Sequence, residues 1–346
     1  MLGFGGSQNT PMLSANITET GRHLNTIISG GFKTSIMMWG APGIGKSSIV
    51  NKVAKSNDME VIDVRLSQLA PTDLRGLPYV KDDVARFAPP SFLPKGGKGI
   101  LFLDEINLAP PAIQNVAMQL VLDRRVGDYV VPDEWFIIAA GNRVEDRAAV
   151  SQMPAPLTNR FIHLTVTADL GSWKEYALSQ GIKEEIISFL NFKPNLLHDF
   201  HKNSIAWPSP RSWDFASDLM KLGLPVDGAV GDGAASELNA FIRVYSKLPD
   251  VEKIMNGDKN VKIPKEPSTI YALVGALVNR SQTADNFFNS MRWLMDAATE
   301  DYVGLFITDA RIRMREAGIL GNFAELLNGS SETKGFIKRY QSLLAN

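Results

Sequence analysis

The sequence predicts an α/β first half built on a parallel sheet, followed by a helical second half. Three observations carry this prediction. A glycine-rich turn at Gly40–Ser47 stands between an apolar strand pattern and a helical stripe. Two fully apolar runs, Gly99–Leu103 and Trp135–Ala140, are typical of strands buried on both faces of a parallel sheet. After about residue 168, strand patterns largely vanish and apolar residues recur at helical spacing.

The chain is expected to begin with a flexible tail over residues 1–14 and a helix that stops at Gly30-Gly31. A strand at Thr34–Trp39 then leads into the pattern Gly, four residues, Gly, Lys, Ser, which wraps a triphosphate with backbone N–H groups. Lys46 can reach the β- and γ-phosphates, and the Ser47 hydroxyl can ligate Mg²⁺. The expected nucleotide contacts are Gly40, Ala41, Pro42, Gly43, Ile44, Gly45, Lys46, Ser47 and Ser48.

After a second strand at Glu60–Val64, residues 67–98 interrupt the alternation of strands and helices. The segment is too long for an ordinary connection and too apolar for disorder, so we expect an inserted hairpin and a short helix. A long packed surface loop is the alternative. The apolar residues expected to hold the insert in place are Phe87, Phe92 and Leu93. A second, smaller hairpin is expected within 124–135.

Polar side chains follow the two buried strands. Asp104 and Glu105 come after the first strand and Asn142 after the second, so they should lie beyond the carboxyl ends of the sheet, where ligands of open α/β folds bind. There Asp104 can hold Mg²⁺ together with Ser47, and Glu105 can polarise an attacking water, which makes hydrolysis the expected outcome. Asn142 can orient that water or touch the γ-phosphate; a plain turn residue is its alternative role.

A strand at Phe161–Val166 is expected to be the fifth of the sheet, and connecting loops are expected at Gly223–Gly233 and Asn256–Pro267. The predicted division is a tail at 1–14, an αβα nucleotide-binding core at 15–168, a helical domain at 169–265 and a helical C-terminal extension at 266–346.

The composition restricts the class of protein. Of 346 residues, 45% are apolar and 21% are charged, which is ordinary for a globular chain with room for two domains. The net charge of −1 gives no bulk attraction to nucleic acid or membranes. The absence of cysteine excludes disulfides, thiolate metal sites and cysteine nucleophiles. With no signal-peptide pattern and no run near 18 apolar residues, we expect a cytoplasmic protein that does not span a membrane.

In this order the motifs resemble those of the AAA+ ATPases, and within them the MoxR-like, dynein-related branch, over about residues 15–215. The matching motifs are Gly40–Ser47 as Walker A, Ile100–Glu105 as Walker B, Asn142 as sensor 1, Asn159-Arg160-Phe161 as the arginine-finger segment and Pro208-Ser209-Pro210-Arg211 as the sensor 2 segment. The inserts at 67–98 and 124–135 match the helix-2 insert and the pre-sensor hairpin of that branch. The first three motifs are specific in combination, and the last two are short.

The resemblance implies a five-stranded αβα domain with a helical lid, assembled into a ring that is usually a hexamer. It implies hydrolysis of ATP with Mg²⁺ to remodel or activate a protein partner, often a companion with a von Willebrand factor A domain. It also implies catalytic roles for two arginines. Arg160 is expected to serve the site of a neighbouring subunit because it precedes a strand on the far side of the sheet, and Arg211 to report the γ-phosphate to the lid. A surface ion pair is the alternative for each.

Two other classes share some of these motifs. A nucleic-acid motor or loader has the same Walker and sensor segments, but the net charge and the lack of a basic recognition element argue against it. A small-molecule kinase would not need a hydrolytic carboxylate after Asp104. A GTPase is disfavoured because Asn51-Lys52 is followed by Val53-Ala54 and not by the Asn-Lys-x-Asp pattern.

Overall fold

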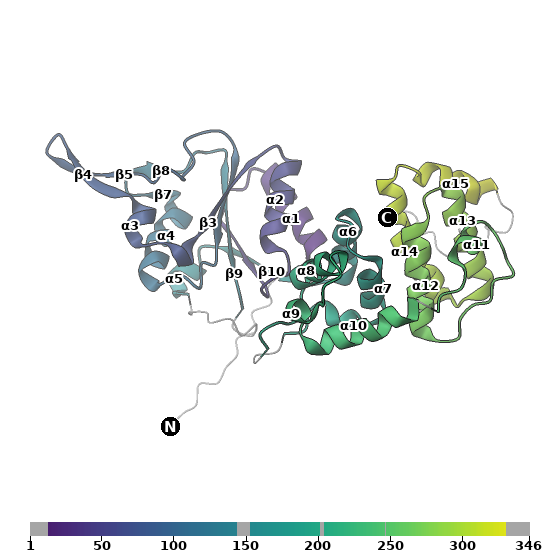
Figure 1. Cartoon of the computed structure of the whole chain (residues 1–346). Coiled ribbons are helices and arrows are strands. Elements are labelled where there is room, and N and C mark those ends of the chain that lie inside the picture. The colour runs from purple at the N-terminus through teal and green to yellow at the C-terminus, as the bar shows by residue number, and fades with distance from the viewer. Residues whose placement is uncertain (1–12, 144–152, 201–203, 246, 330–346) are drawn as a thin grey trace, which may run out of the picture. The chain divides into compact units, whose positions relative to one another are not determined.

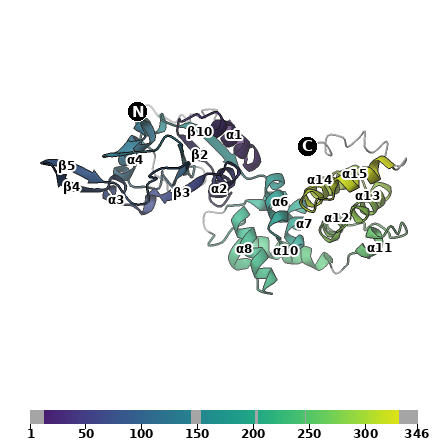
Figure 2. The ribbon, with the colours of Figure 1, turned by 90° about the horizontal axis from the view of Figure 1, so that it is seen from above.

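The computed structural model describes residues 13–143, 153–200, 204–245 and 247–329. The chain divides into two compact units, Met1–Ala168 and Asp169–Asn346, and each is described by itself (Figures 1 and 2). Within the described residues, no helix is both long and apolar enough to cross a membrane.

The first unit contains a parallel sheet of six strands in the order β1-β10-β2-β9-β6-β3. The strands are β1 (Leu13–Asn16), β2 (Ile36–Trp39), β3 (Glu60–Arg65), β6 (Gly99–Asp104), β9 (Trp135–Gly141) and β10 (Ile162–Thr167). The α/β P-loop class expected from the sequence is therefore confirmed, with one strand more than the five expected. The additional strand β1 includes Leu13 and Ser14, which we had assigned to the tail; it forms only by pairing with β10, about 150 residues later, and this pairing has no local signal.

Helices cover both faces of this sheet. Figure 1 shows α1 (Ile17–Ser29) and α2 (Lys46–Ser56) on one side, and α4 (Pro111–Asp123) with α5 (Ala155–Thr158) on the other. Side chains of β9 alternate between the two cores: Ile138 packs among residues of α1 and α2, whereas Ile137 packs among residues of α4. Since both faces of the strand are buried, the run has no polar positions, which explains its fully apolar sequence.

The insert at 67–98 holds the expected hairpin and short helix, so the packed-loop alternative is wrong. They are α3 (Pro71–Arg75) and the antiparallel strands β4 (Leu77–Lys81) and β5 (Val84–Ala88), and the hairpin projects from the sheet in Figure 1. The second insert forms β7 (Arg125–Val126) and β8 (Tyr129–Val130). The hairpin turn at Asp82 and Asp83 has positive φ at both residues, which matches the twist of the two strands.

The two inserts are joined to each other. The Phe87 N–H donates to the Asp128 carboxylate at 2.9 Å, and the Arg75 guanidinium lies over the Phe87 ring at 5.6 Å. The Tyr129 hydroxyl donates to the Pro94 carbonyl at 2.7 Å. Leu93 is 2% exposed, which anchors the end of the first insert in the core. Phe92 packs against the same core while partly exposed, so Phe92 and Leu93 hold this insert as expected. Phe87 is not part of that core, and its contacts are with Asp128 and Arg75 of the two inserts.

The second unit is helical. Its helices are α6 (Leu170–Ser179), α7 (Glu184–Phe192), α8 (Pro210–Lys221), α9 (Asp227–Val230), α10 (Asp232–Tyr245), α11 (Val251–Met255), α12 (Pro267–Arg280), α13 (Ala284–Ala297), α14 (Glu300–Glu316) and α15 (Leu320–Gly329). The loop expected at Gly223–Gly233 is partly wrong, because α9 and the start of α10 lie within it. The glycines of this segment favour a loop, but this local preference is weak. Packing of Val230, which is 1% exposed, overrides it in α9.

Side chains link the segments that we expected to be a lid and an extension. Lys174 of α6 forms a buried ion pair with Asp309 of α14, and the Asn191 amide of α7 donates to the same carboxylate at 3.0 Å. Arg280 of α12 pairs with Glu184 of α7 at 2.7 Å. A separate core within α11–α15 includes Phe287, Phe306 and Leu294. These contacts link the two segments, and the division between residues 265 and 266 stays a prediction.

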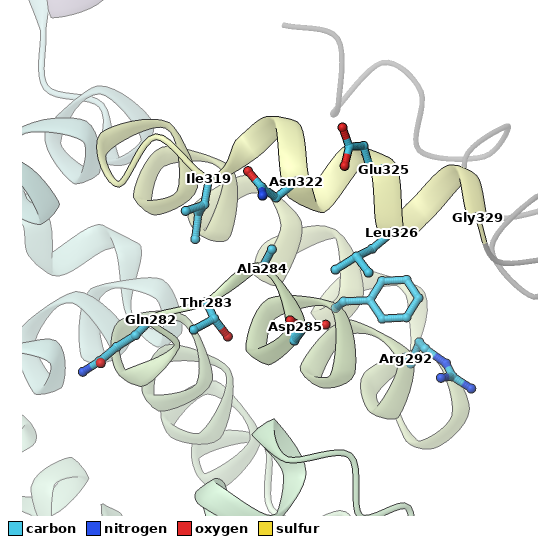
Figure 3. A pocket seen from close by; sticks show the side chains of 11 residues that line it. Gln282, Thr283, Ala284, Asp285, Arg292, Ile319, Asn322, Glu325, Leu326 and Gly329 are labelled. Carbon is cyan, nitrogen blue, oxygen red and sulfur yellow. The ribbon is translucent and has the colours of Figure 1, made fainter.

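A cavity of about 930 Å³ lies between α13 and α15 (Figure 3). Its lining mixes the apolar Phe288, Ile319 and Leu326 with the charged Asp285, Arg292 and Glu325. The Arg292 guanidinium lies 5.6 Å from the centre of the Phe288 ring. Both signs of charge are present, so the lining specifies no ligand of one charge.

The close contact between α7 and α12 gives a stability prediction. A Cβ added at Gly275 would lie 1.7 Å from Ser188 Oγ and 2.8 Å from Ser188 Cβ, and Ser188 is 0% exposed. Gly275→Ala is therefore expected to cost about 1–3 kcal/mol through overpacking. For a unit of this size, about 2–4 °C of melting temperature is lost per kcal/mol.

Gly321→Ala in α15 is the matched control, because nothing lies within 4 Å of its added Cβ. It should leave the melting temperature unchanged or slightly raised. Calorimetry of both variants checks this, and equal melting temperatures would contradict the packing argument.

Candidate functional site

The glycine-rich loop connects the end of β2 directly to α2. Gly43 has φ +77° and Gly45 has φ +101°, backbone conformations that residues with a Cβ rarely adopt. Gly45 is the N-cap of α2 and supplies no side-chain bond to the first turn. The N–H groups at this helix start therefore point at the loop with the positive end of the helix dipole, which makes a ready anion site.

Lys46 is held over this loop. Its side chain is buried, and its Nζ donates to the carbonyl of Gly40 at 2.7 Å, to that of Ala41 at 3.0 Å and to Asn142 Oδ1 at 3.1 Å. Asn142 follows β9, the neighbour of β2 in the sheet, and this neighbourhood brings together residues 96 positions apart. The lysine and the asparagine that the sequence placed at the two strand ends thus meet in space.

Ser47 and Asp104 face each other. The Ser47 hydroxyl lies 3.5 Å from Asp104 Oδ2. Burial raises the pKa of the Asp104 carboxyl; the Glu105 backbone N–H and the Lys46 ammonium oppose this, and the Glu105 carboxylate adds to it. An ionised Asp104 is thus incompletely compensated, and a cation bound beside it would stabilise the charge.

Glu105 adopts a left-handed backbone conformation with φ +56°, which is uncommon for a residue with a side chain. Its carboxylate Oε2 accepts a hydrogen bond of 2.6 Å from the Ser67 hydroxyl. Ser67 follows β3 in a short 3-10 turn, so it also lies at the carboxyl edge of the sheet. Sequence reasoning missed Ser67; its place directly after the strand at Glu60–Val64 was the available signal.

Asn107 is a second residue that the sequence analysis missed. It is 2% exposed, its Nδ2 donates to the Asn142 carbonyl at 2.7 Å, and its Oδ1 accepts from the Asn142 N–H at 3.2 Å. These two hydrogen bonds to the Asn142 backbone fix Asn142 beside Lys46. Asn107 lies three residues after Asp104 in the sequence. Its role in holding Asn142 is visible only once β9 is known to lie beside β6.

The residues present fit a magnesium–nucleotide complex. Ser47 and Asp104 offer the hydroxyl and carboxylate oxygens that Mg²⁺ prefers, and Lys46 with the helix start offers positive potential for phosphate. Within the described ranges, no group of three or more His, Cys, Asp or Glu side chains could hold a metal ion alone. A magnesium ion here would need the phosphates of a nucleotide as further ligands, as is usual for Mg²⁺.

Arg160 lies at the amino ends of the strands, opposite the carboxyl ends where the phosphate loop lies. It comes just before β10, whose first residue Ile162 pairs with Ile36, the first residue of β2, whereas the glycine-rich loop follows the last residue of β2. The length of β2, about 10 Å, separates these two ends of the sheet. The Arg160 guanidinium donates to the Pro156 carbonyl at 3.2 Å. The segment before it forms the single helical turn α5, which begins after Pro154.

Arg211 belongs to the second unit. It is the second residue of α8, directly after Pro210, and its side chain is exposed. Ser209 caps this helix by accepting a hydrogen bond from the Ser212 N–H at 3.1 Å. Arg211 thus lies in the first turn of a helix of the second unit.

The profile of the AAA domain, dynein-related subfamily, matches residues 35–161. This chain carries an AAA domain of the dynein-related subfamily. The resemblance to dynein-related AAA+ ATPases seen in the sequence is therefore confirmed, and the match spans β2 to the residue before β10. No curated protein matched the chain.

Three solved structures are similar in part to the chain bearing this AAA domain. NtrX from Brucella abortus in complex with ADP is 18% identical, with 94% of this chain and 68% of that chain covered and a TM-score of 0.41. A protein from Cytophaga hutchinsonii, named for an inferred ATPase activity, is 15% identical, with 83% of this chain and 78% of that chain covered and a TM-score of 0.35. The RuvB Holliday junction branch migration motor of Thermotoga maritima is 14% identical, with 92% and 83% covered and a TM-score of 0.35. At these values no functional conclusion follows from them.

The bridge from Asn107 to Asn142 gives a prediction for the AAA domain. Asn107→Ala leaves two partly buried backbone groups of Asn142 without their partner, which should cost about 1 kcal/mol of stability, the lower end of the range for lost buried partners. It should also weaken nucleotide binding, since Asn142 is then released from Lys46. Thermal unfolding and titration with a fluorescent ATP analogue measure the two effects.

Asn51→Ala is the matched control, because the exposed Asn51 amide only donates to Ser47 in its own helix. It should change neither quantity appreciably. Unchanged nucleotide affinity in Asn107→Ala would show that the bridge does not hold the site.

Proposed function

We propose that this protein is a ring-forming, Mg²⁺-dependent ATPase of the MoxR type that couples ATP hydrolysis to remodelling or activation of a protein partner. The observation that carries the proposal is the convergence of Lys46, Ser47, Asp104, Glu105 and Asn142 at one edge of the sheet. In the described chain, these groups come from three neighbouring strand ends. Together they supply a phosphate cradle, a cation site and a carboxylate that can act on water.

Each side chain has a role in this proposal. Lys46 exchanges its bonds to loop carbonyls for bonds to the β- and γ-phosphates, and Ser47 with Asp104 holds Mg²⁺, which neutralises charge on the phosphates. Glu105 polarises the attacking water. Because Ser67 donates to the same carboxylate, we propose that Glu105 must leave Ser67 before it can act as a base. Asn142 orients the water or touches the γ-phosphate.

Arg160 is proposed to act on the nucleotide of a neighbouring subunit. It lies at the edge of the sheet opposite its own phosphate loop, so its own site is out of reach along the sheet. A cation supplied across an interface stabilises charge that develops on the transferred phosphoryl group and can raise turnover by several powers of ten. A ring, with a hexamer as the expected form, gives each site such a neighbour. Arg211 is proposed to signal the nucleotide state to the helical lid.

The partner is proposed to be a protein, with a von Willebrand factor A domain companion as the candidate that the MoxR resemblance suggests. The support from the structure is the projecting hairpin of the first insert. Its apolar residues are unusually exposed: Leu77 is 68%, Tyr79 44%, Val80 75% and Val84 52% exposed. Exposed apolar side chains on a structured insertion mark a contact surface. The net charge of −1 disfavours the nucleic-acid motor.

The proposed chemistry is tested by two substitutions at the site. Glu105→Gln should bind ATP normally and lower kcat by about 10²-fold or more, since the water loses its base while the phosphate cradle stays. Lys46→Ala should lose nucleotide affinity itself. Measurements of ATP-analogue binding and of released ADP and phosphate distinguish the two effects.

Lys52→Ala, an exposed lysine on the same helix, is the control and should behave as the unchanged protein. Near-normal turnover in both site variants would refute the assignment. Stimulation by single-stranded DNA would favour the nucleic-acid alternative, and transfer of phosphate to a small molecule would favour a kinase.

The hairpin surface gives its own prediction. Val80→Ser should change stability by less than about 0.5 kcal/mol, because the side chain is already exposed. Basal ATP hydrolysis should stay unchanged, while a Glu105→Gln chain that also carries Val80→Ser should retain less partner protein in affinity capture. Leu222→Ser, a 73% exposed apolar residue of the second unit, is the matched control. If Glu105→Gln alone, with Val80→Ser and with Leu222→Ser all retained the partner protein equally, the hairpin would not belong to the partner surface.

A further inference from the structure

His163 on β10 uses both of its ring nitrogens. The Trp39 indole Nε1–H donates to His163 Nδ1 at 2.8 Å, and His163 Nε2 lies 2.8 Å from the Thr158 carbonyl oxygen. An indole nitrogen can only donate, so Nδ1 is the acceptor and the proton of a neutral imidazole sits on Nε2, facing the carbonyl. The two rings are nearly parallel, with centroids 6.0 Å apart and planes 14° apart, as expected for rings joined edge to edge by this bond. Both bonds therefore specify one tautomer and one ring position.

The two ends of this chain of bonds lie at functionally distinct places. Trp39 is the last residue of β2 and directly precedes Gly40, whose carbonyl accepts a bond from the Lys46 ammonium. Thr158 is the last residue of α5 and lies two positions before Arg160. One imidazole thus connects the start of the phosphate loop with the segment that carries the proposed finger, across the length of β2.

Nucleotide binding would act on the first of these ends. A triphosphate competes with the Gly40 carbonyl for the Lys46 ammonium, because charge-assisted bonds to phosphate are the stronger ones. Gly40 is covalently joined to Trp39, so a change in the loop reaches the indole, then His163 and then the Thr158 carbonyl. An apolar residue at position 163 would fill the same space but would transmit no directional contact.

We propose that His163 is a positioning residue that couples the phosphate loop of a subunit to the arginine which that subunit offers to its neighbour. The inference rests on the proposed function, in which Arg160 acts on the neighbouring site. His163 touches no substrate; it acts through Trp39 and Thr158. Its loss should therefore impair the neighbour's turnover and leave nucleotide binding by its own subunit intact.

Three variants test the relay in the assembled full-length protein. His163→Phe keeps an aromatic ring in the same space and removes both hydrogen bonds, so kcat should fall about tenfold, or about 1.4 kcal/mol in the barrier, with KM near normal. Trp39→Phe should give the same fall, and the double variant should be no worse than either single one. His163→Gln, whose amide can both accept and donate, should recover part of the activity. If His163→Phe does not fold, Trp39→Phe and His163→Gln carry the comparison.

Mixed rings then show where the defect acts. Lys46→Ala subunits have no working nucleotide site but keep Arg160 and His163, and their Gly40 carbonyl lacks the ammonium, as it does once phosphate has taken Lys46. Mixing them with His163→Phe subunits should raise activity above that of either variant alone, because intact pockets then meet correctly placed arginines. Arg160→Ala mixed in the same way is the positive reference. Asn142→Ala is the negative control, since its defect lies in its own pocket and Lys46→Ala cannot compensate for it.

The outcomes separate the relay from the proposal on which it rests. Rescue of Arg160→Ala without rescue of His163→Phe would overturn the relay alone. Rescue of neither would show that Arg160 does not act across subunits, and the proposed ring mechanism would fall together with the relay. A raised KM with unchanged kcat in His163→Phe would place the residue in support of its own pocket and would also overturn the inference.

Discussion

The structure of the AAA domain depends on how a buried ammonium is satisfied. Lys46 is 9% exposed, and burial of an unpaired cation costs several kcal/mol. Two loop carbonyls and the Asn142 amide oxygen turn toward it. This arrangement requires the loop to wrap tightly, which the glycines permit, and it requires β9 to lie beside β2. Asn107 then fixes Asn142, so a residue outside the motif becomes part of the site.

The contacts at this edge are those that a ligand would replace. Lys46 is engaged by carbonyls and Glu105 by Ser67, while burial raises the pKa of the Asp104 carboxyl. A magnesium–nucleotide complex supplies the phosphate oxygens and the cation that these groups need. In our proposal, binding therefore rearranges several hydrogen bonds together. Trp39 and His163 extend the rearrangement from the loop to the opposite edge, where Arg160 lies.

The second unit and the inserts obey different constraints. Within the second unit, a buried ion pair joins α6 to α14, and a close glycine contact joins α7 to α12. The first insert instead leaves apolar side chains in solvent at the end of a hairpin, although its base is tied to the second insert. Packing explains the base of the hairpin but not its exposed residues, which is why we assign them to a partner.

The sequence alone determined the AAA fold class, the phosphate loop and five of the six strands of the sheet, because glycine spacing and buried parallel strands leave strong local patterns. It also indicated the inserts and the residues Asp104, Glu105 and Asn142, since these stand directly after recognisable strands. The tertiary structure decided the rest. Strand β1, the Ser67 bond to Glu105, the Asn107 bridge and the His163 relay each join segments far apart in the chain or on separate strands. Such contacts depend on strand order, and no local pattern encodes which strand ends become neighbours.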